Sequence, residues 1–221
     1  MQAIQAIRKT LPQGLREGLR DLADAALVSR ARRRTIRTST RAADNEYARG
    51  RWDYLGGLEE MTRYAVIAGY CRFGGGASSV LDLGCGFGLL RRWLGPPDAV
   101  EYVGVELSNL AIEAARREWT DARTRFVATD AATYAPERKF DMIVFNEVLY
   151  YFDRPDEILG RFASVLTKGG RFVISLWASP DSRLAWRRSH ASVRVVDEVQ
   201  VNHHSGVSWQ IRLCEPRISA P

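Results

Sequence analysis

Short apolar runs alternate with helical stretches along most of the chain, and this alternation predicts the fold. Buried strands are expected at runs rich in β-branched and aromatic residues, namely 79–83, 100–105, 125–128, 140–145 and 171–176. Helices are expected between them at 89–94, 109–119 and 155–166, with Ser108 as a cap for the second. Strands alternating with helices imply a parallel sheet covered on both faces.

Two further β-rich runs follow the last of these strands. Residues 193–201 and 207–213 are separated only by the turn NHHSG, which predicts an antiparallel hairpin. The expected fold class is therefore α/β, with a Rossmann-like, doubly wound, mostly parallel seven-stranded sheet and an antiparallel C-terminal hairpin.

The segment before the first strand, residues 44–73, has apolar residues at helical spacing. We expect one face of this segment to pack on the core; the stripe consists of Tyr47, Leu55, Leu58, Met61, Tyr64, Ala65 and Ala68. Three aromatic residues near its start, Tyr47, Trp52 and Tyr54, are also placed to form the wall of a lid over a ligand-binding edge.

Charge divides the chain of 221 residues into a basic arm, 1–45, and a body, 46–221. The net charge of +6 belongs entirely to the arm, while the two signs balance in the body. Apolar residues in the arm share one face of a predicted helix: Leu11, Leu15, Leu19, Leu22 and Ala26. Two interpretations remain open for this basic amphipathic helix. One is peripheral docking on an anionic membrane, a lipid-linked substrate or an acidic partner through residues 8–41; the other is packing of the leucines on the body.

Composition also restricts the compartment and the partners. Three widely spaced cysteines without a CxxC pair argue against a disulfide framework and against a metal site. A cytoplasmic protein is expected, because no apolar stretch approaches the ~20 residues that cross a bilayer and residues 1–10 lack the apolar region of a secretory signal. Nucleic acid is not expected as a partner, because the positive charge is confined to the arm. The oligomeric state stays open.

A glycine-rich turn follows the first predicted strand. Its pattern, D-x-G-x-G-x-G, runs from Asp82 through Gly84 and Gly86 to Gly88 and differs from the dinucleotide fingerprint G-x-G-x-x-G. An acid directly before the first glycine repels a phosphate, so a ligand with a cationic group is favoured. The glycines allow positive φ and close approach of the backbone.

Two more acids end the next strands. Glu106 can accept hydrogen bonds from both hydroxyls of a ribose, and Asp130 can reach the exocyclic amine of a base. Acids at three successive strand ends describe a ligand with a cationic amine, a ribose and an adenine, which is S-adenosylmethionine.

Five blocks of sequence resemble the successive motifs of class I S-adenosylmethionine-dependent methyltransferases. They lie within residues 78–177 and read VLDLGCGFG, VGVELS, ATDAATY, FDMIVFNEVLYYF and LTKGGRFVIS. The resemblance implies that Asp82, Gly84, Cys85 and Gly86 flank the methionine moiety. It also implies that Glu106 and Leu107 hold the ribose, that Asp130 and Ala131 hold the adenine, and that the backbone of Asn146 holds the amino acid end.

The fourth block carries the candidates for catalysis. In NEVLYYF, Tyr151 stands where relatives that read EVLEHV have a histidine. The block is also similar to that of the rhizobial nodulation N-methyltransferases, which act on the amino sugar of a chito-oligosaccharide. Candidate bases are Glu147, Tyr151, His203 and His204, although Glu147 can instead hold the cofactor or cap the next helix.

The expected function is therefore methyl transfer to an O or N atom of a small molecule or glycan. The alternative is a catalytically silent protein of the same fold that uses its basic arm to dock on a partner or a membrane surface.

Overall fold

The strands of the sheet follow the order β3-β2-β1-β4-β5-β7-β6 in the computed structural model, which describes residues 39–96 and 98–217. Their bounds are β1 Ser79–Leu83, β2 Glu101–Glu106, β3 Thr124–Ala128, β4 Phe140–Asn146, β5 Leu166–Trp177, β6 Val193–Asn202 and β7 Ser208–Pro216. The first five pair in parallel, and β7 is antiparallel to both β5 and β6. The predicted fold class is confirmed, including the terminal hairpin.

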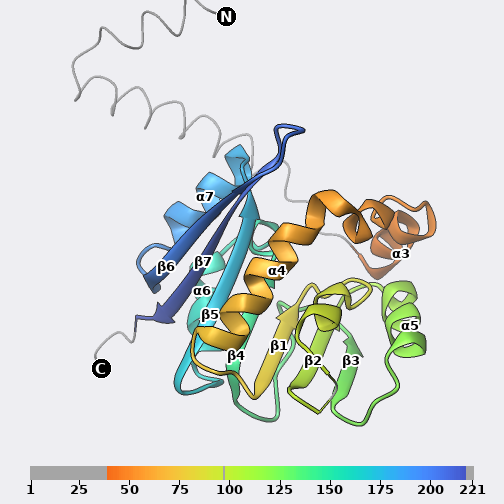
Figure 1. The fold of residues 1–221 in the computed structure, drawn as a ribbon, viewed down its shortest axis with the longest axis horizontal. Coiled ribbons are helices and arrows are strands. Elements are labelled where there is room, and N and C mark those ends of the chain that lie inside the picture. The colour runs from red at the N-terminus through yellow and green to blue at the C-terminus, as the bar shows by residue number, and fades with distance from the viewer. Residues whose placement is uncertain (1–38, 97, 218–221) are drawn as a thin grey trace, which may run out of the picture. The chain divides into compact units, whose positions relative to one another are not determined.

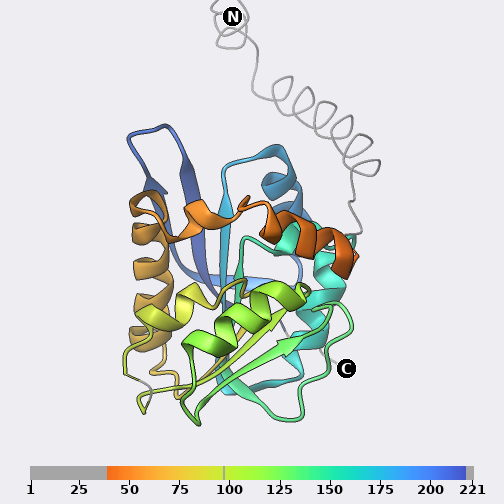
Figure 2. The ribbon, with the colours of Figure 1, turned by 90° about the vertical axis from the view of Figure 1, so that its right-hand side faces the viewer.

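Helices cover both faces of the sheet (Figures 1 and 2). The α-helices are α3 Thr40–Ala48, α4 Leu58–Phe73, α5 Asn109–Glu118, α6 Pro155–Ala163 and α7 Pro180–Ser189, and the 3₁₀ helices are η1 Asp53–Gly56, η2 Leu89–Trp93 and η3 Leu149–Tyr151. Side chains of α4, η2 and α5 form one buried cluster with the sheet, and side chains of α6 and α7 form another on the opposite face. Alternate residues of β1 enter the two clusters, with Val80 in the first and Leu81 and Leu83 in the second. Among the described residues, no helix has the length and apolar character needed to span a membrane.

The predicted helix before the first strand is broken, and its stripe is partly wrong. Gly57 has an extended backbone at the start of α4, so the segment divides into α3, η1 and α4. Leu58 and Met61 are 76% and 43% exposed, whereas Glu60 and Arg63 are buried in their place. A prediction from hydrophobicity places charged residues on the surface. Glu60 and Arg63 can be buried because they form an ion pair with each other.

Other boundaries also differ from the prediction. The element after β1 is the five-residue 3₁₀ helix η2 rather than an α-helix, and α6 ends at Ala163 because the chain enters β5 at Leu166. The prediction missed α7, whose buried residues, Ser182, Ala185 and Ser189, are too small and polar to give an apolar stripe.

The arm lies almost wholly outside the described residues, as does the amphipathic helix predicted within it. The proposed division at residue 45 falls inside α3, which packs against α5.

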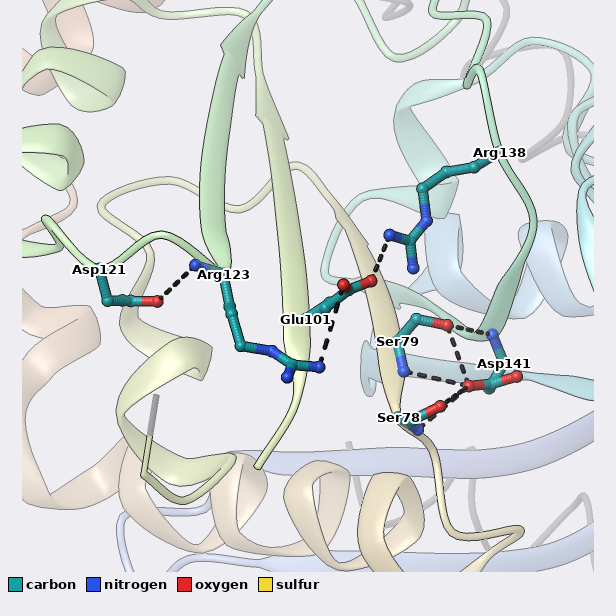
Figure 3. Close-up of polar contacts among 7 residues, drawn as sticks. All are labelled: Ser78, Ser79, Glu101, Asp121, Arg123, Arg138 and Asp141. Carbon is teal, nitrogen blue, oxygen red and sulfur yellow. Dashed lines mark hydrogen bonds and ion pairs between the residues drawn. The ribbon is translucent and has the colours of Figure 1, made fainter. Parts of the chain in front are cut away.

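Polar contacts close the amino-terminal edge of the sheet (Figure 3). One oxygen of Asp141, on β4, accepts hydrogen bonds from the backbone and hydroxyl of both Ser78 and Ser79 at 2.7–3.1 Å. Glu101, at the start of β2, pairs with Arg123 at 3.9 Å and with Arg138. The charges at this edge are therefore engaged within the protein, opposite the edge where the glycine turn lies.

Gly104, in the middle of β2, is required for packing. A Cβ there would lie 2.7 Å from Cys85 Sγ and 2.8 Å from the Phe126 ring. We expect Gly104→Ala to lower the free energy of unfolding by about 1–3 kcal/mol in denaturant titrations. Gly160 of α6 is the matched control, because a Cβ there meets nothing within 4 Å and Gly160→Ala should stabilise the protein by up to about 1 kcal/mol. Equal effects of the two substitutions would contradict this explanation.

Candidate active site

The glycine turn lies between the carboxyl end of β1 and η2, where the strand order reverses between β1 and β4. Gly84, Gly86 and Gly88 have φ of 72°, 55° and 73°, a region that side chains rarely adopt. A Cβ on Gly84 would lie 2.8 Å from a methyl group of Val148, so this turn touches the segment after β4. In open α/β sheets this reversal point is where ligands bind.

The turn is not built for a pyrophosphate. A dinucleotide site places its phosphates at the N-terminus of an α-helix that follows β1. Here the following element is a short 3₁₀ helix, and the N–H of Gly86 donates to Glu106 Oε2 at 3.1 Å. The Glu106 carboxylate disfavours a phosphate at this position, whereas the sequence had assigned that effect to Asp82.

Glu106 ends β2 and organises the centre of the site. Its Oε1 accepts from the N–H groups of Leu107 at 2.8 Å and Ser108 at 3.1 Å. Its Oε2 accepts from Gly86 and, at 3.4 Å, from the hydroxyl of Tyr47. Burial raises the pKa of Glu106 above its usual value, although the backbone donors oppose this shift. The long Tyr47 contact is the one that a ribose hydroxyl can replace most easily.

Helix α3 is tied across this part of the site. Asp44 Oδ1 accepts from the Ser108 hydroxyl at 2.6 Å and from the N–H of Leu110 at 3.1 Å, at the start of α5. The Tyr47 ring stands edge-on to Phe87 of the glycine turn, with ring centres 5.0 Å apart. Tyr47 therefore forms a wall over the turn, as its place before the first strand predicted, but its hydrogen bond to Glu106, 59 residues away, could not be read from the sequence.

Asp82 lies deeper than the other two predicted acids. It is 1% exposed and accepts a 2.6 Å hydrogen bond from the Tyr102 hydroxyl. Its Oδ1 has no partner among the described residues and so retains capacity for a donor. Because carboxylate oxygens accept hydrogen bonds, Asp82 suits a cationic amino group and Glu106 suits the hydroxyls of a ribose. The residues present are therefore compatible with S-adenosylmethionine.

Burial raises the pKa of Asp82 to about 7. A carboxyl group whose pKa is raised on folding favours the folded state below its unfolded pKa, and this contribution is lost as the pH rises through the folded pKa. We expect Asp82→Asn to remove roughly 4 kcal/mol of pH-dependent destabilisation between about pH 4 and pH 7. Denaturant titrations across this range provide the test, and parallel pH profiles of the two proteins would contradict it.

Asp130 and Ala131 follow β3 at the outer part of the site. Asp130 is exposed, and its Oδ1 accepts from the N–H of Ala132 at 2.8 Å, which fixes the turn. Arg161 donates to the carbonyl of Ala131 at 2.7 Å. Cys85, in contrast, is 8% exposed, and burial raises the pKa of its thiol, so it contributes backbone rather than a reactive sulfur.

Glu147 directly follows β4 and is the non-glycine residue with positive φ, 58°, in the described chain. Such strain costs on the order of 1–3 kcal/mol and commonly marks functional positions. Its carboxylate accepts from the Trp177 N–H at 3.0 Å, the Ser175 hydroxyl at 3.3 Å and the Tyr150 hydroxyl at 3.4 Å. Burial raises the pKa of Glu147 to about 7. This carboxylate can therefore exchange a proton near neutral pH.

The other candidate bases lie around this carboxylate or at the rim. Tyr151 is 42% exposed, with its ring 4.8 Å from that of Tyr150, and burial raises the pKa of its phenol. A neutral phenol donates a hydrogen bond rather than acting as a base. His203 and His204 lie between β6 and β7, and His203 Nδ1 is 3.4 Å from Glu59 of α4.

Two charged residues that the sequence did not indicate complete the site. Glu60 and Arg63 of α4 form a buried ion pair, and Arg63 also donates to the side chain of Asn146 at the end of β4. The available sequence signal for this pair was its spacing, with opposite charges at i and i+3 of a predicted helix. Solvent-exposed pairs have the same spacing, so the signal could not show that this pair is buried.

Comparisons with known proteins identify the family to which the chain belongs. A family model described as a methyltransferase domain matches residues 27–211. A trans-aconitate 2-methyltransferase of Methylobacterium radiotolerans is 35% identical over 109 residues, which cover 47% of this chain and 41% of that relative. The chain thus spans less than half the length of the first curated relatives that it matches.

Two solved structures share the fold. The N-methyltransferase NodS from Bradyrhizobium japonicum WM9, in complex with S-adenosyl-L-homocysteine, has a TM-score of 0.63 at 21% identity and covers 75% of this chain and 92% of that one. The 1,6-didemethyltoxoflavin-N1-methyltransferase of Burkholderia thailandensis has a TM-score of 0.64 at 22% identity, with 81% and 87% covered. At these identities the likeness shows the fold alone. With the family match over residues 27–211, the chain belongs to the methyltransferase-domain family, as the resemblance to class I S-adenosylmethionine-dependent methyltransferases implied.

Proposed function

We propose that this methyltransferase transfers its methyl group to a nitrogen or oxygen atom of a small-molecule or glycan acceptor, with amino sugars as the leading class. The observation that carries the proposal is the Glu147 carboxylate, which directly follows β4 at positive φ and is held by the Trp177 N–H and by the hydroxyls of Ser175 and Tyr150. Burial raises its pKa, which suits a group that takes up a proton. A protonated amine must lose a proton before it can attack, and a hydroxyl must lose one as it attacks, so both acceptors need such a group.

S-adenosylmethionine supplies a methyl group on a positively charged sulfur, which the lone pair of the acceptor displaces. In the proposal the parts of this cofactor are held by residues at or just after the carboxyl ends of the first four strands: Asp82, Gly84, Cys85, Gly86, Glu106, Leu107, Asp130, Ala131 and Asn146. Tyr47 shields the ribose side from water. Correct placement of the two reactants can contribute up to ~7–11 kcal/mol to catalysis.

The acceptor side is aromatic and acidic. Tyr151 and Trp177 are 42% and 47% exposed beside Glu147, and aromatic faces suit the apolar faces of a sugar ring. Two of the proteins of similar fold are N-methyltransferases by name and a third is an O-methyltransferase by name, so the proposal keeps both nitrogen and oxygen as the atom attacked. We place the reaction in the cytoplasm, because the buried cysteines Cys71, Cys85 and Cys214 are unpaired.

A tritium-transfer assay with matched acceptors tests the proposal. We expect label to pass from S-adenosylmethionine to glucosamine oligosaccharides with a free amine and to be lost when the same oligosaccharides are fully N-acetylated. Small phenols and other glycans belong in the same screen. Cofactor binding without transfer to any nitrogen or oxygen acceptor would overturn the proposal.

A further inference from the structure

Arg63 is a charged side chain, 1% exposed, beneath the acceptor side of the site. Its Nε donates to Glu60 Oε2 at 2.9 Å, and Nη2 contacts the same oxygen at 2.5 Å. Its Nη1 donates to Asn146 Oδ1. The guanidinium also lies 4.6 Å from the centre of the Tyr64 ring and 5.8 Å from that of Trp209. All three nitrogens of the guanidinium therefore donate to side chains of the protein itself, Glu60 and Asn146.

Stability alone is a weak reason for this arrangement. A buried ion pair is often no more stabilising than apolar residues of the same volume, because removing two charges from water is costly. What distinguishes this pair is the hydrogen bond from Arg63 to the Asn146 side chain. This bond links α4 to the last residue of β4, which is 83 positions away in the sequence. Glu147, with its positive φ, follows immediately.

The charge of Arg63 also acts on Glu147. Burial raises the pKa of Glu147, Arg63 lowers it, and Glu60 raises it again. The groups that face this carboxylate are Arg63 and Glu60 from α4, Tyr54 from η1, Tyr150 and Tyr151 from η3, and Ser175 and the Trp177 N–H from β5. Arg63 is the cation among them, so it favours the ionised form that accepts a proton.

We propose that Arg63 is a positioning residue for methyl transfer: its hydrogen bond to the Asn146 side chain ties α4 to the end of β4 and fixes the position from which the next residue, Glu147, projects. The inference rests on the proposed function, in which Glu147 accepts the proton. Arg63 does not touch the acceptor and acts only through these two residues.

The test uses two sets of substitutions with opposite expected signs. Arg63→Met combined with Glu60→Gln removes both charges, and the protonation midpoint of Glu147 should rise by about one pH unit. Glu60→Gln alone leaves Arg63 uncompensated, and the midpoint should fall. The midpoints are measured by NMR in full-length protein with ¹³C-labelled glutamate carboxyls, without acceptor, and the Glu147 signal is assigned from Glu147→Gln.

Kinetics provide the second readout. In the double variant kcat at pH 7 should fall about fivefold, with little change in the KM of the acceptor, and should recover partly as the pH is raised. Arg91→Lys is the matched control, because Arg91 is also buried but bonds to Thr124 and Gly95 at 2.8 and 3.1 Å. It should lower stability without moving the Glu147 midpoint.

An unchanged Glu147 midpoint in both Glu60→Gln and the double variant would overturn the inference, whatever their activity. If the double variant does not fold, Glu60→Gln alone decides it, because an acceptor oxygen for Arg63 remains at position 60. Failure of the proposed function gives a different result, in which the midpoints shift as expected but Glu147→Gln retains full transfer.

Discussion

Glu106→Ala is expected to weaken the binding of S-adenosylmethionine, and of its demethylated product, by at least about 100-fold. Two charge-assisted hydrogen bonds to ribose hydroxyls are worth about 1.5–3 kcal/mol each, and every 1.4 kcal/mol corresponds to roughly a tenfold change in affinity. The substitution also releases the N–H groups of Gly86, Leu107 and Ser108, so the glycine turn loses the group that holds it. Titration calorimetry measures this effect directly.

Glu101→Ala is the matched control for that experiment. Glu101 is the same residue type on the same strand, but it lies at the opposite edge of the sheet and pairs with Arg123 and Arg138 (Figure 3). It should leave the affinity for the cofactor unchanged. Binding by Glu106→Ala as tight as that of the unsubstituted protein would refute the assignment of the ribose to Glu106.

Glu147→Gln is expected to lower kcat by about 10²- to 10⁴-fold while leaving cofactor binding within a few-fold of the original. Glutamine keeps the shape and can still accept from Trp177 N–H and Ser175, but it cannot take a proton. In the unsubstituted protein, kcat should fall about tenfold per pH unit below the Glu147 pKa of about 7. This acidic limb should disappear from the residual activity of the variant.

The Glu147→Gln substitution should lower activity but raise the stability of the folded protein. Because burial raises the pKa of Glu147, its protonated form is favoured in the folded state, and the corresponding stabilisation is lost as the pH rises through about 7. Glu147→Gln should therefore raise the melting temperature at pH 8 more than at pH 5. The exposed Glu157 of α6 gives a control substitution, Glu157→Gln, without either effect. Unchanged kcat in Glu147→Gln would remove Glu147 as the base.

Much of the site was predictable because its signals are local. The positive φ of Gly84 and Gly86 within one turn favours glycine at both positions. Glu106 ends β2 and Asp130 follows β3, two strands that the pattern of apolar residues predicts. Parallel strands bring their carboxyl ends to one edge, so positions at those ends could be grouped without coordinates. Even the cap of α5 by Ser108, at 3.1 Å from the Ala111 N–H, was visible as a local pattern.

The error on the buried face of α4 has a tertiary cause. Leu58 and Met61 of α4 were expected in the core, but Glu60 and Arg63 are buried there instead. The sequence could not show this, because the burial of Arg63 depends on partners on α4 and at the end of β4 at once. The same holds for Tyr47, whose partner is on β2.

The sequence by itself therefore determined the order of the strands along the chain, the helices α5 and α6 between them, the glycine turn, and the acids that meet at one edge of the sheet. These features could be predicted because hydrophobic period and backbone conformation are properties of neighbouring residues. Only the tertiary structure decided which charges enter the core, how deeply Asp82 lies, and how α3 and α4 close on the ends of β2 and β4. Those features depend on desolvation and on contacts between side chains up to 83 positions apart, where the free energy of a charge is set by its partner rather than by its place in the chain.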